Sequence, residues 1–165
     1  MKKVRDVKNE RALRQQLVDF LDWRSAHVGF DAAITGLRPG LRGTVPKGFE
    51  HSVWQLVEHM RIAQNDILDF CRNPRYVEKK WPDDYWPAAP APRSAAAWST
   101  SLANVRRDRR AMQRLAGDSR IDLFARIPHG SGQTYLREIL LVADHAAYHI
   151  AQIVDLRRAL GNWKA

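Results

Sequence analysis

The stretch NPRYVEKKWPDDYWPAAPAP, residues 73–92, decides how the helices of this chain are ordered. It carries five prolines, and each removes a backbone donor that a helix or a central strand would need. A connection of 20 residues is long for a compact domain. Fully extended, it reaches about 66 Å, whereas a helix of 20 residues is about 30 Å long. The segment can therefore return along the whole length of a helix, and we predict a crossover between parallel helices.

Four long helical patterns surround this crossover, separated by segments rich in proline and glycine. They cover residues 8–24, 52–72, 93–117 and 134–161, and a shorter helical piece covers 27–37. The second pattern opens on Ser52 followed by Gln55, the spacing of a capping box. The longest connection lies between the second and the third of the long patterns, and antiparallel neighbours need only short loops. The sequence thus predicts an all-α, up-down-down-up four-helix bundle with a long crossover between helices 2 and 3, as a single domain over residues 1–165.

Charge, cysteine content and the length of the apolar runs limit the classes of protein to which this chain could belong. The chain has 27 Lys and Arg against 18 Asp and Glu, a net charge of +9, which keeps a nucleic-acid binder as an alternative. The densest basic run, VRRDRRAMQR at 105–114, is more typical of a solvated helix face. The single cysteine, Cys71, fits a reducing compartment and is expected to be passive. The polar start and the short apolar runs predict a cytoplasmic protein without a membrane partner.

Two histidines lie four residues apart in LLVADHAAYHI, residues 140–150. On a helix, His145 and His149 project from one side, the spacing that lets two imidazoles share one ion. Ala146 stands where the HExxH motif has its catalytic glutamate, which argues against a metalloprotease. Alone, such a pair is more typical of core histidines than of metal ligands. His59, at the edge of the apolar face of the second helix, favours a metal site between facing helices.

The segments HSVWQLVEH (51–59) and DHAAYHIAQIVDLRRALG (144–161) resemble those of the DinB superfamily of DinB/YfiT-like metalloenzymes. The resemblance covers about residues 10–161. It implies an up-down-down-up bundle whose metal is held by one histidine of the second helix and two of the fourth, here His59, His145 and His149. It also implies zinc, nickel, iron or manganese as the divalent metal, and frequent homodimers. The few assigned members resemble thiol-dependent S-transferases or isomerases.

Three histidines with an open position are typical of a catalytic metal site. Two reactions stay open: an activated water could attack an ester or amide of a small-molecule substrate, or the metal could bind a low-molecular-weight thiol for transfer. Which group is catalytic is unknown from the sequence. The alternative is a non-catalytic metal-binding, ligand-binding or stress-related interaction protein on the same scaffold, with a nucleic-acid binder less favoured.

Three polar residues stand seven positions from a histidine, about 20° away on the helical wheel. They are Asp66, Glu138 and Gln152, and each could orient an imidazole N–H. His51 is interpreted as a helix cap or pocket wall, His129 as a surface residue, and the role of His27 is left open. The aromatic residues of 73–92 either hold the crossover against the bundle, cover the metal pocket or form a dimer contact.

Overall fold

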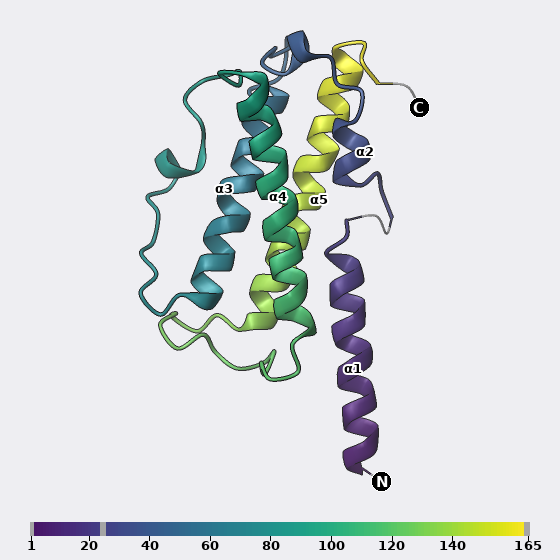
Figure 1. The fold of residues 1–165 in the computed structure, drawn as a ribbon, viewed down its shortest axis with the longest axis vertical. Helices are drawn as coiled ribbons and strands as arrows, with labels where there is room; N and C mark the ends of the chain where they lie inside the picture. The colour runs from purple at the N-terminus through teal and green to yellow at the C-terminus, as the bar shows by residue number, and fades with distance from the viewer. Residues whose placement is uncertain (1, 24–25, 164–165) are drawn as a thin grey trace.

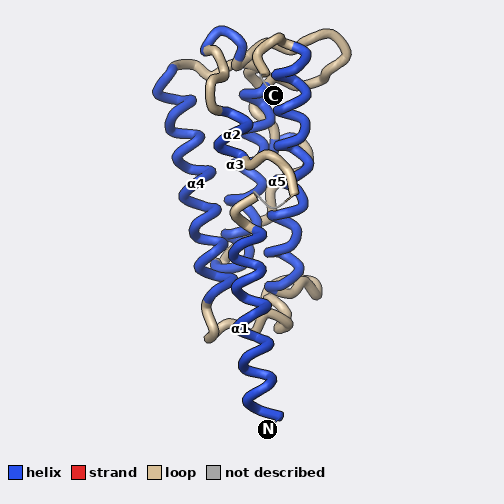
Figure 2. The backbone as a smooth tube through the Cα atoms, turned by 90° about the vertical axis from the view of Figure 1, so that its right-hand side faces the viewer, coloured by secondary structure: helices blue, strands red, loops and turns tan. Residues whose placement is uncertain are grey.

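Four long helices packed together make up this all-α protein (Figure 1). The computed structural model describes residues 2–23 and 26–163. Its elements are α1 (Lys2–Phe20), α2 (Phe30–Ile34), the short 3-10 turn η1 (Pro39–Leu41), α3 (Val53–Arg72), a second 3-10 turn η2 (Asp83–Tyr85), α4 (Ala95–Gly117) and α5 (Tyr135–Ala159). Helix α3 packs against both α4 and α5, and α1 packs mainly along α4. The N-terminal part of α1 extends beyond the ends of the other helices (Figure 2).

Each long helix after the first begins at a hydroxyl side chain. At α3 the predicted capping box is present: the Ser52 hydroxyl accepts the Gln55 N–H at 3.1 Å, and the Gln55 side chain accepts the Ser52 N–H at 3.0 Å. Ser94 caps α4 and Thr134 caps α5 through the hydroxyl alone, which accepts the backbone N–H of Ala97 and of Arg137. These caps satisfy backbone donors that have no partner inside a helix.

The crossover runs back along the outside of the bundle, from the end of α3 to the start of α4 (Figure 1). Its far end is tied to the start of α3, because the Ser52 hydroxyl also donates a hydrogen bond to the carbonyl of Pro90. One hydroxyl can do both, since it has one donor and two acceptor positions. The crossover is therefore attached to the helix from which it departs.

Helix α5 supplies the centre of the core. Ile139, Val142, Ile150 and Ile153 are all buried at helical spacing. By length and composition alone α5 is apolar enough to cross a membrane, a test that the core helix of a bundle also passes. Half of its most apolar window is buried against the rest of the chain, which fits the role of a core helix.

The predicted helix over 8–24 is partly wrong, because α1 starts earlier and ends at Phe20. The chain turns at Trp23, which has a left-handed φ of 58°. This turn buries the indole, whose ring meets Phe30 at 6.0 Å and lies under the Arg109 guanidinium at 5.3 Å. Burial of a large aromatic surface offsets the cost of the unusual backbone. Of the predicted positions, residue 24 lies outside the described residues.

The second predicted piece, 27–37, is reduced to the five residues of α2. Its C-terminal carbonyls have no partner within so short a helix. Arg157 of α5 supplies one: its guanidinium donates to the carbonyls of Ala33 at 2.6 Å and Thr35 at 2.9 Å. Arg157 is only 4% exposed, so its positive charge is buried and bonds the backbone of the fold instead of facing solvent.

We predict that Ser52→Ala destabilises the protein more than Ser94→Ala. Both substitutions remove a helix cap, which costs about 1 kcal/mol. Only Ser52→Ala also removes a hydrogen bond to the crossover, which adds about another 1 kcal/mol. Urea unfolding of both variants beside the wild type measures the difference. Equal losses would show that the bond to Pro90 contributes nothing.

Candidate metal centre

The three predicted histidines meet between α3 and α5. The Nε2 atom of His145 lies 3.0 Å from Nε2 of His59 and 3.1 Å from Nε2 of His149. The nearest ligand atoms of the three residues all lie within 4.8 Å of one another. Since α3 and α5 pack directly, residues 86 positions apart in sequence form one cluster that could hold a metal.

Hydrogen bonds on the opposite side of two rings determine which nitrogen is free. The Nδ1–H of His59 donates to the carbonyl of Tyr85 at 3.0 Å. The Nδ1–H of His149 donates to the side-chain oxygen of Gln152 at 2.7 Å. A neutral imidazole has a single N–H, so both rings direct an Nε2 lone pair into the cluster. If Nε2 of His145 carries a proton, that single N–H would have to serve the lone pairs of both His59 and His149. A bound cation would instead accept a lone pair from each of the three nitrogens.

Two of the three spacings between the ligand nitrogens are close to those around a metal ion. Two nitrogens bound tetrahedrally to zinc at about 2.0–2.1 Å lie about 3.3 Å apart. The observed 3.0 and 3.1 Å are within a few tenths of an ångström of that value. Imidazole nitrogen is a ligand suited to zinc, nickel and iron. The cluster could therefore hold a divalent metal.

Burial keeps these imidazoles neutral. It lowers the pKa of His145 to about 3 and that of His149 to about 4, because a charged ring would lose its hydration between the helices. The pKa of His59 is also lowered, again chiefly by burial. Only the neutral ring has a lone pair for a metal. The site thus holds its ligands in the metal-binding form well below neutral pH.

The crossover covers one side of the cluster with Trp86. Its indole stacks on the His59 ring with the centroids 3.9 Å apart and the planes 1° apart. His51 stacks on the other face of the same indole at 4.0 Å. His51 therefore supports Trp86 from behind, whereas the predicted capping role belongs to Ser52. Trp86 prevents the His59 ring from rotating and keeps solvent from one of its faces.

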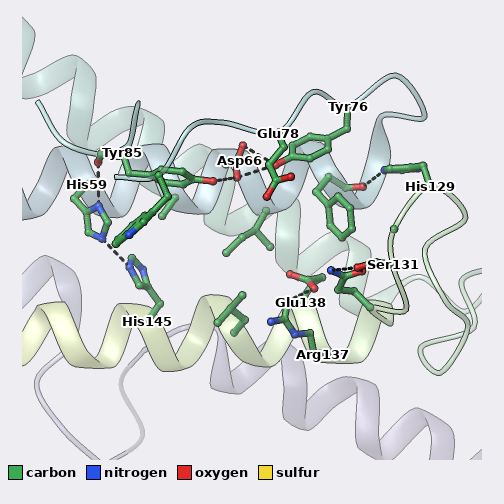
Figure 3. A pocket seen from close by; sticks show the side chains of 17 residues that line it. His59, Asp66, Tyr76, Glu78, Tyr85, His129, Ser131, Arg137, Glu138 and His145 are labelled. Carbon is green, nitrogen blue, oxygen red and sulfur yellow. Dashed lines mark hydrogen bonds and ion pairs between the residues drawn. The ribbon is translucent and has the colours of Figure 1, made fainter. Parts of the chain in front are cut away.

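A cavity of about 640 Å³ adjoins the histidines (Figure 3). The His59 and His145 side chains lie at one end of it, and the charged and polar residues Asp66, Glu138, Arg137 and Ser131 lie farther along. Its walls come from α3, the crossover, the α4–α5 loop and α5. The aromatic residues of the crossover that line it are Tyr76, Trp81 and Tyr85. A small molecule in this volume would reach two of the three ligand histidines.

Of the three residues expected to orient an imidazole, the structure places Gln152 against one, at His149. Glu138 is buried and instead pairs with Arg137 at 2.6 Å. Within the described part of the chain, the hydrogen-bond partners of Asp66 are the hydroxyls of Tyr76 and Tyr85. The helical wheel placed all three on the correct side of their helices, but it cannot tell which neighbouring group a side chain will bond.

The remaining singled-out residues lie outside the cluster. His27 is exposed and bonds the carbonyl of Val28. His129 is exposed, as expected, but it also lines the cavity and donates to the carbonyl of Phe70 at 2.8 Å. Burial raises the pKa of the Cys71 thiol to about 12, so it remains protonated and unreactive.

Sequence reasoning missed the role of Tyr85 and Trp86 as direct partners of His59. Their aromatic character was a signal that the crossover packs on the bundle. The bond to His59, however, comes from a backbone carbonyl, which every residue has. No residue pattern could have identified it.

A family model for the DinB superfamily matches residues 23–153. The matched region contains α2 to α4, most of α5 and all three clustered histidines. The chain therefore belongs to the DinB superfamily. Neither the curated proteins nor the solved structures contain a match to it.

The lowered histidine pKa values predict that the metal-free protein loses stability as pH falls. Between about pH 6.5, where an unfolded histidine titrates, and about pH 4, the unfolded chain binds more protons than the folded one, so unfolding becomes easier. Each buried histidine contributes at most about 2 kcal/mol to the loss between pH 7 and 5. Urea unfolding of chelator-treated protein at both pH values measures it. The control, His145→Gln, should lose less; an equal loss would contradict the assignment.

Proposed function

We propose that this protein is a metal-dependent enzyme that acts on a small molecule, as a thiol-dependent S-transferase or a hydrolase. The observation that carries the proposal is the position of the cluster. Neutral His59 and His145 line the end of a cavity large enough for a small-molecule substrate. A site with only a structural purpose would have no need of such an opening.

His59, His145 and His149 would hold the metal, and the other residues of the site would control its surroundings. Gln152 and the Tyr85 carbonyl hold two of the rings in the ligating tautomer. Trp86 excludes water from one side of His59. A divalent cation bound there would supply Lewis acidity, with its charge left intact by neutral ligands.

The cavity residues bear on the choice between the two reactions. Asp66 and Glu138 are carboxylates whose oxygens already accept hydrogen bonds from Tyr85 and Arg137. Each lies seven residues, about 10 Å along its helix, from the nearest ligand histidine. Neither is placed like the glutamate of HExxH, one residue after a ligand. This favours a substrate that ionises easily by itself, such as a low-molecular-weight thiol, over hydrolysis that needs an adjacent base.

Other features belong to the same proposal. The up-down-down-up order of helix directions and a homodimer rest on membership of the superfamily, and a cytoplasmic location rests on the single cysteine. The course of the crossover along the bundle supports the first of these (Figure 1). The second candidate function, a non-catalytic metal-binding or ligand-binding protein, has the same three histidines and differs only in turnover.

Metal analysis tests the site. We expect purified wild-type protein to contain about one equivalent of divalent metal, and His145→Ala to lose most of it, because two histidines hold a metal much more weakly than three. His129→Ala is the matched control, since it removes a histidine of the same cavity that lies outside the cluster. Its metal content should equal that of the wild type. Mass spectrometry of the proteins, after dialysis against zinc and then buffer, measures all three.

Turnover separates the enzyme from the binder. With metal-loaded protein, we expect loss of a low-molecular-weight thiol in the presence of an electrophilic acceptor, and little hydrolysis of generic esters. A chelator should abolish the reaction and added metal should restore it. Metal-loaded protein that turns over neither class of substrate would leave the non-catalytic function as the better account.

A further inference from the structure

We infer that Asp66 is a positioning residue for the ligand His59 and acts on it through Tyr85. The inference rests on the proposed metal site, and it assigns a purpose to the crossover. It differs from the direct contact between Asp66 and an imidazole that the helical wheel predicted.

Tyr85 bonds α3 at two points. Its hydroxyl donates to Asp66 at 2.6 Å, and its backbone carbonyl accepts the Nδ1–H of His59 at 3.0 Å (Figure 3). The bond to a carboxylate is short, as expected when the acceptor is charged. One residue of the crossover thus connects a carboxylate to the far side of a ligand ring.

The two attachment points have a fixed separation. Asp66 follows His59 by seven residues on the same helix, so they lie about 10 Å apart along its axis. Both are buried, at 6% and 3% exposure. Tyr85 spans this interval with its ring at one point and its carbonyl at the other. Holding the ring at Asp66 therefore restricts where the carbonyl can lie.

This restriction matters because the crossover is long. A backbone carbonyl within a connection of 20 residues would otherwise be free to move away from His59. The next residue, Trp86, lies flat on the same imidazole. Asp66 therefore holds both the acceptor that selects the His59 tautomer and the ring that limits its rotation.

Tyr76 provides an internal control. Its hydroxyl also donates to Asp66, at 3.2 and 3.3 Å, and like Tyr85 it comes from the crossover and lines the cavity. The contact between the crossover backbone and His59, however, is made by Tyr85. Loss of either hydroxyl removes a partner of Asp66, but only loss of the Tyr85 hydroxyl should affect His59.

The experiment compares Tyr85→Phe with Tyr76→Phe in the full chain. We expect Tyr85→Phe to raise the Kd for zinc by about tenfold, as loss of a group that orients a ligand histidine does. Tyr76→Phe should change it by less than about twofold. Asp66→Asn, which keeps the shape and a neutral acceptor, should fall between wild type and Tyr85→Phe. Thermal unfolding confirms that each variant is folded.

A second measurement needs no metal. In metal-free protein, nitrogen NMR of the imidazoles should show His59 protonated at Nδ1 in wild type and in Tyr76→Phe, and a mixture of tautomers in Tyr85→Phe. A merely structural role of Asp66 would not alter this signal selectively. If wild type binds no zinc, the proposed function fails while the tautomer comparison still decides this inference. Equal His59 signals in both variants, or equal zinc affinities, would overturn it.

Discussion

The hydrogen bond from the His59 imidazole to the Tyr85 carbonyl joins the two parts of this structure that matter most for its chemistry. On one side is α3, a helix of the bundle; on the other is a crossover outside it. The bond determines that Nδ1 carries the proton, so Nε2 faces the other two histidines. Without it the three rings would still lie close together, but nothing would hold the His59 lone pair toward the other two rings.

Burial has a second effect on the cluster: it keeps the imidazole rings neutral. The rings of His145 and His149 lie between packed helices, where a charged imidazole is unfavourable. The apolar residues of α5 therefore do more than stabilise the bundle, because they also help to keep these two histidines neutral. The cost is lower stability at acidic pH in the absence of a metal, which binding to the folded state would offset.

The positive charge of the chain has a similar internal use. Arg157 bonds the last carbonyls of α2, and Arg14 donates to the carbonyls of Ala116, Asp118 and Ile121, which lie where α4 ends. Both arginines are buried. A planar guanidinium with five donors suits this task. The net charge of +9 thus reflects, in part, how helix ends are satisfied, which weakens its value as a sign of nucleic-acid binding.

The sequence by itself determined the all-α class, the Ser52 capping box and the His145/His149 pair, because each depends on spacing along a single helix. His59 lies on another helix, and its place at the edge of an apolar face and the family resemblance made it the third candidate. Periodicity and helix caps are local properties, and His145 and His149 are one helical turn apart on the same helix. Only the tertiary structure decided that Asp66 bonds two tyrosines, that Trp86 covers His59, and that the chain turns at Trp23. Those contacts join residues far apart in sequence, or use backbone atoms common to every residue, so no local pattern specifies them.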